Sequence, residues 1–62
     1  MELTRGERYL RMIKSVTKSR PIAFQEEFFR QEIEMVTANA EFHKLSKEDI
    51  EFLKNAQFEV KE

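Results

Sequence analysis

The apolar residues of this chain recur with the period of an α-helix in three separate segments. The first stripe falls on one side of a helix. Thr4 followed three residues later by Glu7 is the pattern of a capping box, which places the start of the helix just after Thr4. We therefore predict a helix over about 5–18. Its apolar stripe consists of Tyr9, Leu10, Ile13 and Val16.

The second segment predicts a longer helix, over about 21–43. Pro21 suits the first turn of a helix, and no later Gly or Pro interrupts the segment. Its apolar residues form two groups roughly 140° apart around the helix. Packing against a single neighbour requires a stripe of only about 100°. The first group is Ile22, Phe29, Ile33, Val36 and Ala40, and the second is Phe24, Phe28, Met35, Ala38 and Phe42.

The third segment predicts a helix over about 47–56. Ser46 stands at the N-cap, and Asp49 occupies the capping-box position, where a longer Glu is more usual. The expected core stripe of this helix is Ile50, Leu53 and Ala56. The tail 57–62 alternates apolar and polar residues, which fits either a short extended arm or a frayed end.

These elements predict an all-α fold, in which residues 1–62 form one small helical domain with a long central helix. A helix over 21–43 would be about 35 Å long, whereas a compact chain of this length is roughly 27 Å across. The second apolar group would then remain uncovered. We expect a homodimeric helical bundle centred on it, and the alternative is a monomeric three-helix bundle in which the helix kinks or ends early, near Asn39. The expected protein-interface residues are Phe24, Phe28, Met35 and Phe42.

The sequence offers little catalytic chemistry. The chain has no cysteine and one histidine, His43, without metal-ligand spacing around it, so we expect a structural or surface role for that residue. No nucleophile–base pattern or phosphate-binding glycine loop is present. We expect no enzyme activity, cofactor, metal or small-molecule substrate. No segment is apolar enough to span a membrane, and the absence of cysteine fits the reducing cytoplasm.

Charge is distributed unevenly along the chain. Residues 1–20 carry six basic and two acidic side chains, a net charge of +4, whereas residues 21–62 carry a net charge of −5. Three explanations stay open: contact with nucleic-acid phosphates, contact with an acidic protein, or neutralisation of the acidic faces of the other helices. The expected contact residues are Arg5, Arg8, Arg11, Lys14, Lys18 and Arg20.

These patterns favour a non-catalytic protein–protein interaction module. We expect it to act as a homodimer that binds a larger protein, because aromatic side chains dominate the energetics of protein interfaces. The alternative is a nucleic-acid-binding regulator that contacts phosphates through the basic helix. The acidic residues Glu48 and Glu51 in the third helix disfavour insertion of that helix into a DNA groove.

Overall fold

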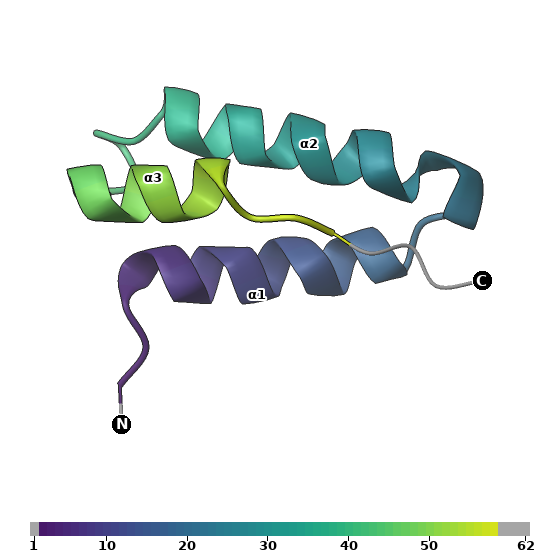
Figure 1. The fold of residues 1–62 in the computed structure, drawn as a ribbon, viewed down its shortest axis with the longest axis horizontal. Helices are drawn as coiled ribbons and strands as arrows, with labels where there is room; N and C mark the ends of the chain where they lie inside the picture. Colours follow the sequence, from purple (N-terminus) through teal and green to yellow (C-terminus); the bar gives the residue numbers. More distant parts are fainter. Residues whose placement is uncertain (1, 59–62) are drawn as a thin grey trace.

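The computed structural model describes residues 2–58, and its regular elements are three α-helices (Figure 1). They are α1 (Arg5–Lys18), α2 (Ile22–Ala38) and α3 (Lys47–Lys54). α1 and α2 lie side by side and antiparallel, and α3 packs against the end of this pair at which α1 begins. The described chain contains no β-strand. The predicted all-α, three-helix class is therefore confirmed.

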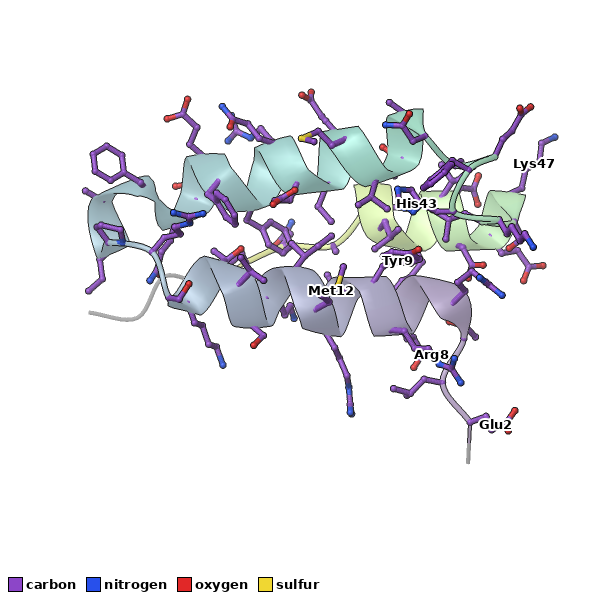
Figure 2. The ribbon with its side chains drawn as sticks, turned by 180° about the vertical axis from the view of Figure 1, so that it is seen from behind. Glu2, Arg8, Tyr9, Met12, His43 and Lys47 are labelled. Atoms are coloured by element: carbon purple, nitrogen blue, oxygen red, sulfur yellow. The ribbon has the colours of Figure 1, made fainter. Side chains whose placement is uncertain are left out.

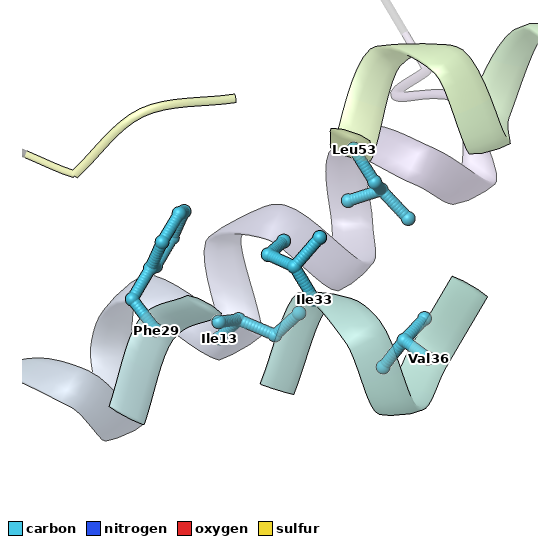
Figure 3. Packing of buried hydrophobic residues seen from close by; sticks show 5 residues of the cluster. All are labelled: Ile13, Phe29, Ile33, Val36 and Leu53. Carbon is cyan, nitrogen blue, oxygen red and sulfur yellow. The ribbon is translucent and has the colours of Figure 1, made fainter. Parts of the chain in front are cut away.

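The hydrophobic core lies where the three helices meet. α3 contributes Leu53, which has no solvent-exposed surface. Burial of each large apolar side chain stabilises the fold by about 1.5–3 kcal/mol. The complete core cluster, drawn in Figure 3, is Ile13, Phe29, Ile33, Val36 and Leu53.

α3 ends at Lys54, two residues before the predicted end at 56, and Asn55 is its C-cap. Ala56 is half-buried beyond the helix. Phe58 then packs on Phe29 with 5.3 Å between the ring centroids. The described part of the predicted tail, residues 57–58, thus covers part of the core through Phe58, and we call this segment the arm. Residues 59–62 lie outside the described range, so the choice between an extended arm and a frayed end stays a prediction.

The helices α1 and α3 begin at the predicted capping boxes. The Glu7 N–H donates to Thr4 Oγ1 at 3.2 Å, and the Asp49 N–H donates to Ser46 Oγ at 3.1 Å. Asp49 has a second role, because its Oδ1 accepts a hydrogen bond from the Gly6 N–H at 3.2 Å while its Oδ2 accepts from the Ser46 N–H at 3.3 Å. One carboxylate therefore caps two helix N-termini, which explains the short Asp at this position.

The close contact at Gly6 requires a residue without a side chain. A Cβ atom at Gly6 would lie only 3.1 Å from Asp49 Cβ and 3.2 Å from Asp49 Cα. Glycine thus permits the first turn of α1 to approach the first turn of α3 closely enough for the hydrogen bond between them.

The prediction of a helix over 21–43 was wrong at its C-terminal end. α2 ends at Ala38, and the Asn39 side chain donates from Nδ2 to the Met35 carbonyl at 2.8 Å. A further turn closes at Lys44, whose φ of 57° is left-handed. The Leu45 N–H donates to the Ala40 carbonyl at 2.9 Å, and the Lys44 N–H donates to the Glu41 carbonyl at 3.2 Å. These two bonds form a Schellman motif.

The central helix is consequently not the long element expected from the sequence. It has 17 residues, and the radius of gyration is 11.6 Å. The helix does not extend beyond a small globule, so the length argument for a homodimer does not hold. The helix end agrees with the alternative of a bundle in which this helix stops near Asn39.

At two places a residue that was predicted to lie in the core is exposed, and a nearby polar residue is buried instead. Val16 and Ile22 are exposed, whereas Thr17 and Gln25 are buried. Thr17 Oγ1 donates to the Ile13 carbonyl at 2.7 Å. Gln25 Nε2 donates to the Arg20 carbonyl at 2.8 Å. Buried polar groups require such partners, and the corner after α1 leaves carbonyl groups that need donors.

Candidate functional site

The two sides of the α1–α2 pair differ in what covers them. On one side the segment after α3 lies over the pair, because Phe58 packs on Phe29 and lines one pocket with Lys14 and Lys18 of α1 and another with Glu26 and Arg30 of α2. The periodicity of the two helices places a set of apolar side chains on the opposite side. We call this set the open face, and its members are Met12, Val16, Phe24, Phe28 and Met35.

The open face leaves much apolar surface in contact with water. Phe24 and Met35 are each 61% exposed, Met12 is 51% exposed and Phe28 is half-buried. Together the five side chains expose roughly 400 Å², which is in the range of the largest apolar patch on a monomeric protein, and such patches are often functional. The open face is therefore the first candidate for a binding site.

Aromatic contacts mark the two ends of the open face. At one end Tyr9 Oη and His43 Nδ1 are hydrogen-bonded at 2.9 Å, and Figure 2 shows Tyr9 and Met12 along α1 with Tyr9 directed toward His43. The rings of Phe42 and His43 pack in a T-shaped arrangement, with 5.2 Å between their centroids. At the other end the Arg20 guanidinium lies 4.7 Å from the centroid of the Phe28 ring, a cation–π contact.

The structure places three of the four predicted interface residues on the open face. Phe24, Phe28 and Met35 lie on one flank of α2. Phe42 is 83% exposed but follows the end of α2, so it does not continue their stripe. The sequence prediction missed the contribution of α1, namely Met12 and Val16. Their i, i+4 spacing was a usable signal, but Val16 was assigned to the core.

The basic residues of α1 are mostly in solvent. Arg8, Arg11, Lys14 and Lys18 follow the outward side of the helix within an arc of roughly 120°. Lys14 is half-buried beside Phe58, whereas the other predicted basic contact residues, Arg5 and Arg20 included, are exposed.

Within residues 2–58 no direct ion pair joins α1 to the other helices. Over residues 2–58 the ion pair within 4.0 Å is that of Arg30 with Glu26, at 3.6 Å and within α2. Neutralisation of the acidic helices by ion pairs from α1 is therefore not observed in the described chain.

Opposite charges border the open face along its two edges. Arg8 and Arg11 are exposed on the α1 edge, and Glu27 and Glu34 are exposed on the α2 edge. Glu32 is half-buried on the flank of α2 between the core and the open face. The face is thus apolar along its centre, basic on one edge and acidic on the other.

The described residues offer little for other types of site. Within the described range no three His, Cys, Asp or Glu side chains come together as a possible metal site. None of the helices in residues 2–58 has both the length and the apolar content needed to cross a bilayer. A groove of about 390 Å³ between α2 and the arm is lined by both apolar and charged side chains, among them Phe29, Arg30 and Lys54.

The comparisons with known proteins give no independent indication of function. Neither family models, nor curated proteins, nor solved structures yield a match to this chain. The open face and its charged edges are therefore the basis for a functional assignment.

Proposed function

We propose that the protein is a small non-catalytic binding module that docks on other proteins through the open face. The observation that carries this proposal is the continuous apolar surface formed by α1 and α2 together. Each exposed large apolar side chain forgoes about 1.5–3 kcal/mol of burial, which is considerable for a domain whose total stability is of the order of 5–15 kcal/mol. The expected occupants are a second copy of the chain and a larger protein, in the cytoplasm.

The shape and chemistry of the open face suit an amphipathic helix. The antiparallel helices carry exposed or half-buried apolar side chains on the same side of the pair, with Met12 on α1 and Phe28 and Met35 on α2. Methionine side chains adapt to different apolar partners, and aromatic residues anchor amphipathic helices. A partner helix with an apolar stripe would cover these side chains along the length of the open face.

A direct test is capture of proteins from nuclease-treated native lysate by the tagged chain. The binding-defective variant carries Phe24→Ser and Met35→Ser, two positions with most of their surface in solvent. The matched control is Phe52→Ser, since Phe52 is 43% exposed but lies on α3, away from the open face. Circular dichroism establishes that both variants fold.

We expect a specific protein to be retained by the wild type and by the Phe52 variant and lost from the double variant. Equal capture by all three chains would refute binding through the open face. The size of the loss is expected to be at least tenfold, since two anchor side chains are removed from an apolar interface.

A second candidate function is nucleic-acid binding through α1. It is favoured by the exposed positions of Arg8, Arg11 and Lys18, which form no ion pair among residues 2–58. It is disfavoured by the sequence pI of about 5.9 and by the acidic α2 edge. A salt-sensitive gel shift of generic DNA or RNA that disappears on Arg11→Glu together with Lys18→Glu would support this candidate, and the absence of any shift at low salt would refute it.

A further inference from the structure

The two edges of the open face carry opposite charges, which restricts how a second copy of the chain could cover it. Two identical faces of this kind, with their helices aligned, can meet about either of two two-fold axes. An axis parallel to the helices places α1 over α2 of the second copy. An axis across the helices places α1 over α1 and α2 over α2.

The charges distinguish these two arrangements. A rotation about the axis parallel to the helices keeps each residue at its height along them. The contact of Gln25 with the Lys18 carbonyl sets the register of the two helices, so the exposed Arg8 and Arg11 of each copy lie level with the exposed Glu34 of the other, and Glu27 lies level with Lys18. With the axis across the helices, arginines face arginines and glutamates face glutamates. Like charges set opposite one another disfavour an association, and complementary edges fix its orientation.

We propose that the open face binds a second copy of this chain about a two-fold axis parallel to α1 and α2, with α1 of each copy over α2 of the other. This inference rests on the proposed function of the open face and names its occupant. The apolar centre supplies the contact, with Met12 and Val16 facing Phe28 and Met35 of the second copy, and the charged edges set the orientation. Association is symmetric, so each favourable edge occurs twice.

The area of the open face indicates a weak dimer. A standard protein–protein interface covers about 800 Å² on each partner, and the exposed apolar part of this face is roughly half of that. We therefore expect a dissociation constant in the micromolar range. Such a dimer exchanges readily, so a larger protein could displace the second copy from the same side chains.

The test uses two charge-reversed chains, one at each edge. The first carries Arg8→Glu and Arg11→Glu, and the second carries Glu34→Arg. The three native side chains are exposed, and none forms an ion pair among residues 2–58. Sedimentation equilibrium over the micromolar range, at low ionic strength, distinguishes the 7.5 kDa monomer from a species of twice that mass.

We expect each variant alone to associate at least tenfold more weakly than the wild type, because like charges then face one another at both edges. An equimolar mixture should recover association to within about threefold of the wild type, since a heterodimer restores opposite charges at both edges. The axis across the helices predicts a different result, in which neither variant alone is weakened and the mixture associates more tightly than the wild type.

Three outcomes overturn the inference: a wild-type chain that stays monomeric throughout, two variants that associate as the wild type does, or a mixture that fails to recover. None of them decides the proposed function, because capture of a larger protein through Phe24 and Met35 is measured separately. Conversely, a dimer restored by mixing supports the inference even where no larger protein is captured.

Discussion

The two apolar sides of α2 carry similar side chains in opposite surroundings. Phe29 packs against Phe58 and is 5% exposed, whereas Phe24, five residues earlier on the same helix, is 61% exposed. The difference arises from what covers each side, since the residue type and the helix are the same. The buried side contributes to the stability of the fold, whereas the open side remains exposed to solvent.

The strongest test of this comparison is a matched pair of substitutions. Phe29→Ala removes a buried ring from the core and is expected to lower the free energy of unfolding by about 3–5 kcal/mol. Phe24→Ala removes an exposed ring and is expected to change the same quantity by no more than about 0.5 kcal/mol. Urea denaturation at low protein concentration measures both. Equal losses would mean that the open side of α2 belongs to the folding core.

The contact between α1 and α3 supplies a second test, because it supports the core without touching the open face. Gly6→Ala places a Cβ atom against Asp49 and should lower the free energy of unfolding by about 1–2 kcal/mol, partly offset by the better helix propensity of Ala. Ser15→Ala, at an exposed position of α1, is the control and should not destabilise the chain. A stabilising effect of Gly6→Ala would show that the two first turns can separate freely.

A smaller effect of opposite sign on the free energy of unfolding is expected at the turn after α2, which ends at Lys44. Lys44 adopts a left-handed conformation with φ of 57°, which costs about 1–2 kcal/mol for a residue with a Cβ atom. Lys44→Gly should therefore raise the free energy of unfolding by about 1 kcal/mol. Lys44→Ala retains the backbone strain and should change the free energy of unfolding by less than about 0.5 kcal/mol. Thermal denaturation of the three chains in parallel measures the difference.

The smallest effect on stability should come from substitution of Glu32, which lies on α2 between the core and the open face. Glu32 is half-buried beside the open face, and covering that face would take its carboxylate further from water. Glu32→Gln should tighten self-association about two- to fivefold, with little change in the free energy of unfolding. Glu34→Gln, on the acidic edge, should weaken it instead. Tightening by both substitutions would contradict the assignment of Glu34 to a charged edge.

Much of the fold follows from local sequence signals. The start of α1 after Thr4 and the start of α3 after Ser46 are both given by capping boxes, whose partners are three residues apart. The core residues Phe29, Ile33 and Val36 follow from helical periodicity. Signals of this kind depend on neighbouring residues alone, so the sequence is sufficient to recognise them.

The features that escaped prediction depend on contacts distant in the chain or on unusual residues. The end of α2 was missed because the helix stops at Ala38, where Asn39 rather than Gly or Pro follows and its side chain donates to the Met35 carbonyl. The burial of Gln25 depends on the Arg20 carbonyl at the preceding corner. The open face required the pairing of α1 with α2, since Met12 and Val16 become part of one surface with Phe28 only after the helices are docked.

The carboxylate of Asp49 also makes one backbone amide informative about folding. Amides in the first turn of a helix ordinarily exchange their hydrogen with solvent quickly, because they have no acceptor within the helix. The Gly6 amide is different, since its acceptor belongs to a residue 43 positions later in the chain. Its exchange requires α3 to leave α1, so the protection of this single amide should follow the opening of the whole bundle.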